Sequence, residues 1–213
     1  MKKTIALLLA VALILACAPA MAAEWRYESD NLGTSIWLPD SLEIYGEFQA
    51  KDEDSLYIFF NMTEDNTQLT ATLTYVPEYK GLQTKDLPKT EIEGWKKLFT
   101  ASYPKHSKSM LIKPIYGGNR RIYRFYGMSK GGNWMLNYSG VKDGLYVSVC
   151  CETGRFGFRR NTMTTVFDVF NYCFQMFAQS RGVSFEPFSR DAYEVEIFDL
   201  LYDDSPNSIF RSY

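Results

Sequence analysis

The sequence is poor in the residue types that most often perform catalysis or bind metals. It contains a single histidine, His106, and four cysteines. A Ser-His-Asp triad or a Cys-His dyad would have to use His106, which lies in the polar stretch PKHSK. No nucleophile elbow G-x-S-x-G, zinc helix H-E-x-x-H or phosphate loop G-x-x-x-x-G-K-[ST] occurs. These absences predict a chain with no catalytic residue set, no metal site and no cofactor.

Acidic residues are absent from one long stretch, Gly94 to Lys142. The cations of this stretch are Lys96, Lys97, Lys105, Lys108, Lys113, Arg120, Arg121, Arg124, Lys130 and Lys142. Such a separation of charge can steer an anionic partner. The other interpretation is that basic and acidic segments face each other within the fold, or that both are solvated. For the first interpretation, the candidate partner-binding residues are Lys105, Lys108, Arg120, Arg121 and Arg124.

Carboxylates are abundant elsewhere but lack the spacing of a recognisable site. The run Asp52-Glu53-Asp54 has oxygen ligands for a cation, yet it has neither the spacing nor the glycine of an EF-hand loop. A solvated loop explains it better. An alternative function, a secreted hydrolase or transferase using paired carboxylates, predicts two acidic side chains in an aromatic pocket.

Long hydrophobic runs are also missing, apart from one at the N-terminus. Lys2 and Lys3 precede an apolar run, Ile5–Ala16, that is shorter than the about 20 residues of a membrane span. The tripeptide Ala20-Met21-Ala22 then has the form that signal peptidase cleaves. We expect residues 1–22 to be a bacterial signal peptide and the exported chain to be periplasmic or extracellular. A lipid anchor on Cys17 is the alternative, although the residues before Cys17 match a lipoprotein site poorly.

The mature chain has the composition of a globular protein. The whole sequence has a net charge of −2, and removal of Lys2 and Lys3 leaves −4. An exported acidic chain is a poor candidate for nucleic-acid binding. Aromatic residues make up 16% of the sequence, which favours a packed, strand-rich body. We expect one domain at 23–179 and a partly ordered C-terminal extension at 180–213.

Hydrophobic periodicity predicts the elements. Strands are expected at 25–29, 34–38, 55–62 and 67–76; the run at 55–62 is apolar on both faces, as in a central strand. A meander follows at 109–116, 121–128, 134–141 and 145–152, and Asp143-Gly144 marks its last hairpin. Helices are expected from Thr90, where TEIE resembles a capping box, to Pro104, and over 161–179. Their expected buried stripes are Ile92, Trp95, Leu98 and Phe99 in the first helix and Val166, Phe167, Phe170, Cys173, Phe174 and Phe177 in the second. This order predicts an α+β fold, with an antiparallel sheet between two packed helices in an α/β/α arrangement.

The mature chain would keep three cysteines, Cys150, Cys151 and Cys173. Neighbouring strand residues point to opposite faces, so Cys151 should face the last helix and Cys150 the other side. Three buried thiols acting as small apolar residues are the main interpretation. A disulfide between Cys151 and Cys173 is the alternative, disfavoured because the helix would carry Cys173 roughly 18 Å from its own start. A functional vicinal or metal site is the third interpretation.

The order of elements resembles the PsbP-like fold, shared by photosystem II extrinsic proteins, a Ran-binding import factor and bacterial envelope proteins. The resemblance lies in the opening stretch WRYESDNLGTSIWLP, the helix around Trp95–Phe99, the meander 111–152 and the closing Phe-rich helix. It spans about residues 25–178. Plant members of the family bind a photosystem, but no ligand set of theirs matches here, so the resemblance implies a fold and no functional residue.

Together these features predict an exported, non-enzymatic envelope protein that serves as a binding or assembly module. Its expected partner is another envelope protein or an anionic surface. A membrane-anchored lipoprotein scaffold is a further alternative, and the sequence does not indicate an oligomeric state.

Overall fold

The computed structural model describes residues 24–50, 54–64, 67–114, 120–154 and 160–190. Nine strands and two long helices lie in these residues. The strands are β1 (Glu24–Ser29), β2 (Thr34–Pro39), β3 (Leu42–Gln49), β4 (Ser55–Met62), β5 (Thr67–Tyr75), β6 (Lys105–Ile112), β7 (Ile122–Met128), β8 (Trp134–Lys142) and β9 (Leu145–Thr153). The helices are α2 (Lys89–Ser102) and α3 (Arg160–Ser180), and two short 3-10 turns, η1 (Pro77–Tyr79) and η2 (Thr84–Asp86), precede α2.

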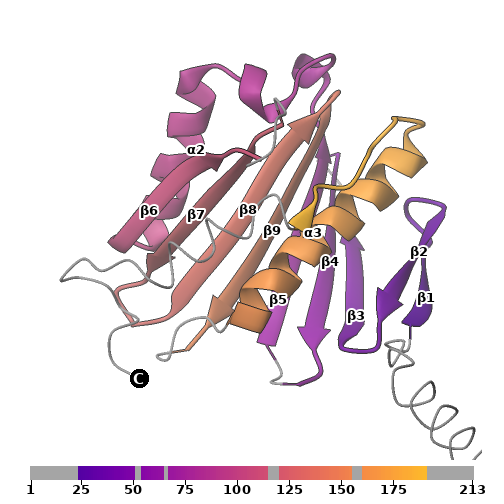
Figure 1. Cartoon of the computed structure of the whole chain (residues 1–213), viewed down its shortest axis with the longest axis horizontal. Helices are drawn as coiled ribbons and strands as arrows, with labels where there is room; N and C mark the ends of the chain where they lie inside the picture. The colour runs from indigo at the N-terminus through magenta and orange to yellow at the C-terminus, as the bar shows by residue number, and fades with distance from the viewer. Residues whose placement is uncertain (1–23, 51–53, 65–66, 115–119, 155–159, 191–213) are drawn as a thin grey trace, which may run out of the picture.

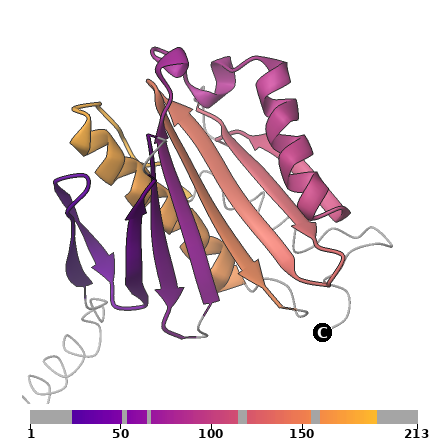
Figure 2. The ribbon, with the colours of Figure 1, turned by 180° about the vertical axis from the view of Figure 1, so that it is seen from behind.

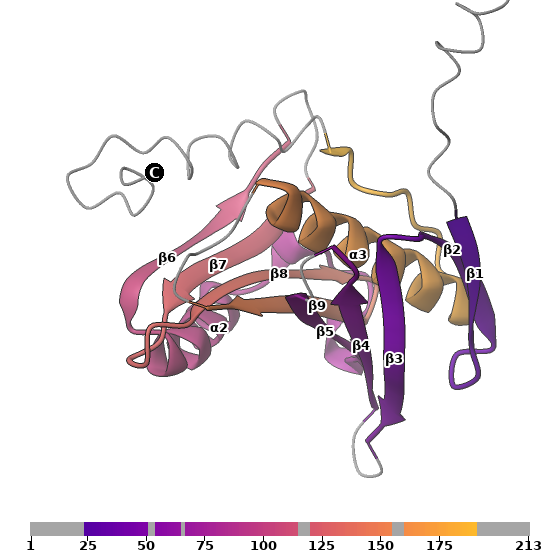
Figure 3. The ribbon, with the colours of Figure 1, turned by 90° about the horizontal axis from the view of Figure 1, so that it is seen from below.

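Seven strands form one antiparallel sheet in the order β3-β4-β5-β9-β8-β7-β6, and β1 and β2 form a separate hairpin. Helix α3 lies across one face of the sheet (Figure 1). Helix α2 lies on the opposite face, over β6 and β7 (Figure 2). Seen edge-on, the sheet separates the two helices (Figure 3). The predicted α+β fold with an antiparallel sheet between two helices is therefore confirmed.

The main core lies between α3 and the sheet. Helix α3 buries a continuous aromatic stripe, whose members include Val166, Phe167, Phe170, Cys173, Phe174 and Phe177. This is the stripe that the 3.6-residue period predicts. Cys151 belongs to this core, whereas Cys150 packs against the smaller cluster under α2, as the alternation along β9 predicts.

The N-terminal hairpin is attached to the edge of this core. The indole of Trp25 donates a hydrogen bond to the carbonyl of Leu42 at 2.9 Å. The carboxylate of Glu47 accepts hydrogen bonds from the Tyr27 hydroxyl, from Ser29 and from Asn31. Burial, followed by the bond to Glu47, raises the pKa of Tyr27. The hairpin is thus joined to β3 by hydrogen bonds, and its Trp25 and Tyr27 also pack against the main core.

Strand β3 is an edge strand that the sequence-based prediction missed. Its alternation is interrupted by a bulge, because Ile44 pairs with Phe60 while Gly46 pairs with Phe59. Beyond the bulge, Phe48 lies on the same face as Tyr45, and both are exposed, at 56% and 53%. Strand β4, predicted to be central, lies between β3 and β5, inside the sheet.

Two details of the predicted helix α2 are wrong. The helix begins at Lys89 and its N-cap is Pro88, so Thr90 lies inside the first turn and does not cap it. Leu98, expected in the buried stripe, is 69% exposed, whereas Ile92, Trp95 and Phe99 pack on the sheet.

Strand β6 also begins at Lys105, before the predicted residue 109. A bulge between Lys105 and Lys108, with positive φ at His106, interrupts the pattern there.

None of the helices within the described residues is both long enough and apolar enough to cross a bilayer. The predicted signal peptide, Cys17 and the extension beyond Arg190 lie outside the described residues. The described part of the extension, residues 181–190, returns along α3. Asn171 holds it through two hydrogen bonds, donating to the Phe188 carbonyl at 3.0 Å and accepting from the Phe188 amide at 2.8 Å.

Candidate functional site

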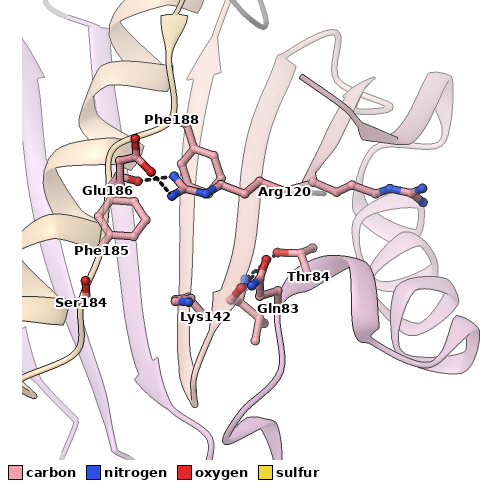
Figure 4. A pocket seen from close by; sticks show the side chains of 10 residues that line it. Gln83, Thr84, Arg120, Lys142, Ser184, Phe185, Glu186 and Phe188 are labelled. Carbon is pink, nitrogen blue, oxygen red and sulfur yellow. Dashed lines mark hydrogen bonds and ion pairs between the residues drawn. The ribbon is translucent and has the colours of Figure 1, made fainter. Parts of the chain in front are cut away.

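A pocket of about 210 Å³ lies at the end of the sheet where β7 begins and β8 ends. We refer to it as the cationic pocket, and its lining residues are Gln83, Thr84, Arg120, Arg121, Val141, Lys142, Ser184, Phe185, Glu186 and Phe188. The cations Arg120 and Lys142 and the carboxylate of Glu186 lie around it, whereas the side chain of Arg121 is directed to the α2 side of the sheet, like that of Tyr123 two residues later. Figure 4 shows Arg120 directed at Glu186, with Phe188 beside its guanidinium.

The register of the sheet brings the basic residues together. Tyr123 of β7 pairs with Ser139 of β8, and the strands are antiparallel. Continuing this register places Arg121 beside Val141 and Arg120 beside Lys142. Arg120 and Lys142, which are 22 residues apart in the sequence, thus meet at one edge of the pocket.

The turn η2 closes a second side of the pocket. Gln83 forms a bridge with Lys142 of β8, and the backbone amide of Val141 donates a 2.8 Å hydrogen bond to the Thr84 hydroxyl. The Gln83 side chain and Asp86 also form a reciprocal capping box around η2. These bonds hold the Gln83–Thr84 pair against the end of β8.

The segment after α3 forms the third side and supplies the aromatic wall. Phe185 stacks on Phe174 of α3, with ring centroids 4.9 Å apart, and Phe188 packs against Phe170 at 5.6 Å. Arg120 donates to the main-chain carbonyl of Glu186 at 2.6 Å and forms an ion pair with its carboxylate. Its guanidinium also lies 5.9 Å from the centroid of the Phe188 ring.

Four of the five predicted partner-binding residues fall into two groups. Arg120 and Arg121 line the cationic pocket. Lys105 and Lys108 are exposed on the edge strand β6 and form what we call the basic edge. Lys105 lies seven residues before Ile112, which pairs with Ile122 next to Arg121. At about 3.3 Å per residue, Lys105 lies roughly 23 Å and Lys108 roughly 13 Å along the strand from Ile112.

Arg124 differs from the other four. It is 5% exposed, and its guanidinium lies 3.0 Å from the sulfur of Met110 on β6. A side chain so deeply buried presents little surface to a partner. Lys142, by contrast, belongs to the cationic pocket although the sequence did not single it out; only the register of β7 and β8 identifies it. Residues 184–188 carried no sequence signal for this role.

Other candidate chemistry is sparse in the described residues. They contain no group of three histidine, cysteine or acidic side chains placed to hold a metal. His106 is exposed and its ring lies 5.6 Å from that of Trp134. The cationic pocket holds one carboxylate, and a wider hollow beside the hairpin contains Glu28 and Asp30 but no aromatic wall.

The three cysteines are thiols in the structure. Cys151 and Cys173 are fully buried, and burial raises the pKa of Cys173. Burial, with a smaller effect of Glu152, raises the pKa of Cys150 to about 12. A thiol with such a pKa is a poor nucleophile at neutral pH.

Comparison with known proteins yields a distant structural likeness. No protein-family model matches the chain, and no curated protein matches it. It is similar to the solution structure of cyanobacterial PsbP (CyanoP) from Synechocystis sp. PCC 6803, with a TM-score of 0.38 and 13% identity. The match covers 76% of this chain and 94% of that one. It concerns the fold alone, and it names the family that the order of elements in the sequence resembles.

Proposed function

We propose that this chain is an exported, non-enzymatic protein of the bacterial envelope that binds an acidic partner through the cationic pocket and the basic edge. The observation that carries this proposal is the convergence of Arg120 and Lys142 on one pocket. Cations on a concave surface concentrate the electrostatic potential and raise the rate of encounter with an anionic partner.

The contacts of Arg120 favour carboxylates as the partner's binding groups. Its guanidinium already holds a carboxylate, that of Glu186, together with a carbonyl. A guanidinium has a planar set of donors that matches a carboxylate. We therefore favour an envelope protein with acidic side chains over an anionic lipid or polymer surface.

Charge reversal on the exposed cations tests this function. The triple variant Lys105→Glu, Lys108→Glu and Lys142→Glu, which changes both the basic edge and the cationic pocket, should reduce retention by isolated envelopes at least tenfold. The double variant Lys96→Glu and Lys97→Glu is the control, because it reverses exposed charges on α2, away from the pocket. Equal retention of wild type, triple variant and control, with folding intact, would contradict the proposal.

Mass spectrometry of the mature N-terminus tests export. We expect cleavage before Ala23 and an unmodified first residue. An acylated Cys17 would instead assign the protein to the membrane-anchored lipoproteins. An uncleaved chain would contradict export through a cleaved signal peptide.

A further inference from the structure

Glu186 occupies the cationic pocket in a way that an external ligand could reproduce. Its side chain is 81% exposed, although its carboxylate is paired with Arg120. Exposed ion pairs contribute only about 0–1 kcal/mol, so this carboxylate can leave at little cost. The carbonyl of Glu186 and the ring of Phe188 also contact the guanidinium, and they would keep it in place.

The segment that carries Glu186 is held independently of this ion pair. Val183 donates a hydrogen bond to the carbonyl of Ala178 at 2.9 Å, and Phe188 is held by Asn171. Arg190 forms an ion pair with Asp168 of α3. Loss of the Glu186 carboxylate should therefore leave the aromatic wall of the pocket intact.

We propose that Glu186 is an internal substitute ligand, and that the cationic pocket binds a carboxylate attached to a small aromatic or apolar group, which displaces the Glu186 side chain from Arg120. The inference rests on the proposed function and specifies the group that the pocket recognises. Arg120 and Lys142 attract the carboxylate, and Phe185 and Phe188 contact the apolar part. The volume, below the roughly 300–1,000 Å³ of sites for drug-sized ligands, limits the ligand to one small group.

Phenylacetate, titrated by calorimetry into the folded protein, tests the inference. Because Glu186 competes with the ligand, Glu186→Gln should bind phenylacetate roughly two- to fivefold more tightly than wild type, the range expected for loss of an exposed ion pair. Glu28→Gln is the matched control, since Glu28 is also in an exposed ion pair, with Arg26, on the hairpin. It should bind like wild type.

Two further comparisons define the recognised group. Arg120→Gln should weaken binding at least tenfold, and Arg120→Lys, which keeps the charge, should weaken it less. The uncharged analogue phenylacetamide should not bind measurably. A Glu186→Gln variant that binds no more tightly than Glu28→Gln, or equal binding of phenylacetamide, would overturn the inference.

The source of the carboxylate is distinguished with a short peptide that ends in phenylalanine. Preference for the peptide with a free terminus over its amidated form indicates a partner's chain end, and binding of phenylacetate alone indicates a free acid; both support a carboxylate site.

The inference and the proposed function can fail separately. Normal envelope retention of the charge-reversed triple variant would reject the function, even if Glu186→Gln binds phenylacetate more tightly.

Discussion

The two faces of the seven-stranded sheet are filled in different ways. On one face, α3 buries a row of phenylalanines, among them Phe167, Phe170 and Phe174, each at most 1% exposed. On the other, α2 has no buried residue, and the buried residues that the sheet contributes to the small cluster beneath it are Tyr123, Phe125 and Met135. The difference indicates that the α3 face carries most of the stability, while α2 is a more weakly attached layer.

The largest expected effect comes from truncating matched phenylalanines on the two faces. Phe170→Ala should cost about 3–5 kcal/mol of unfolding free energy, because it leaves a cavity among Tyr138, Phe174 and Phe188. Phe99→Ala on the half-buried α2 should cost about half as much, since less apolar area is lost. Urea denaturation measures both. Equal losses would contradict the difference between the faces.

A cluster of three buried polar side chains distinguishes the α2 face of the sheet from the α3 face. Asn137 donates to Ser148 at 2.7 Å and accepts from Ser139 at 2.7 Å, and all three side chains are buried. Asn137→Ala should cost about 1–3 kcal/mol because it leaves the serine hydroxyls with fewer partners. Denaturation of the variant measures the loss. A change below about 0.5 kcal/mol would mean that this group contributes little.

Replacing each of two glycines by alanine should change the unfolding free energy in opposite directions. A Cβ at Gly140 would lie 2.9 Å from Phe170 and 3.1 Å from Phe174, so Gly140→Ala should cost about 1–3 kcal/mol through overpacking. A Cβ at Gly94, within α2, meets nothing within 4 Å, so Gly94→Ala should stabilise the protein by up to about 1 kcal/mol. Thermal melts check both signs. A stabilising Gly140→Ala would show that the core under α3 is loosely packed around this glycine.

Thiol labelling compares the faces without mutation. Cys150, partly exposed on the α2 side, should react with iodoacetamide before Cys151 and Cys173, which need unfolding. Because the pKa of Cys150 is raised to about 12, its rate should rise about tenfold per pH unit between pH 7 and 10. Mass spectrometry counts the labels. Three labels on the denatured mature chain fit three thiols, whereas a single label would indicate the alternative Cys151–Cys173 disulfide.

Local sequence patterns predicted the helices and strands well where the hydrophobic period and the turn residues indicate the same element. The stripe of α3 follows the 3.6-residue period, and the Asp143-Gly144 turn has positive φ at both residues, 50° and 84°, as a type I′ hairpin needs. Strand β3 was missed because the bulge before Gly46 changes which face its side chains point to. The bulge at His106 likewise concealed the start of β6.

The site was only partly predictable, because its residues meet through long-range contacts. Charge alone drew attention to Arg120 and Arg121. Their neighbours come from η2, from the end of β8 and from the segment after α3, and no local pattern links these segments. Glu186 in particular could not be recognised from local sequence, because its ion-pair partner Arg120 is 66 residues away.

The central claim, that the cationic end of the sheet is the binding surface, is tested most directly by mapping amide chemical shifts of the labelled protein during a phenylacetate titration. The account predicts that the largest shifts fall on Thr84, Arg120, Lys142 and Glu186, around one pocket. Shifts centred instead on the exposed aromatic face of β3, at Tyr45 and Phe48, or no shifts at all, would contradict it.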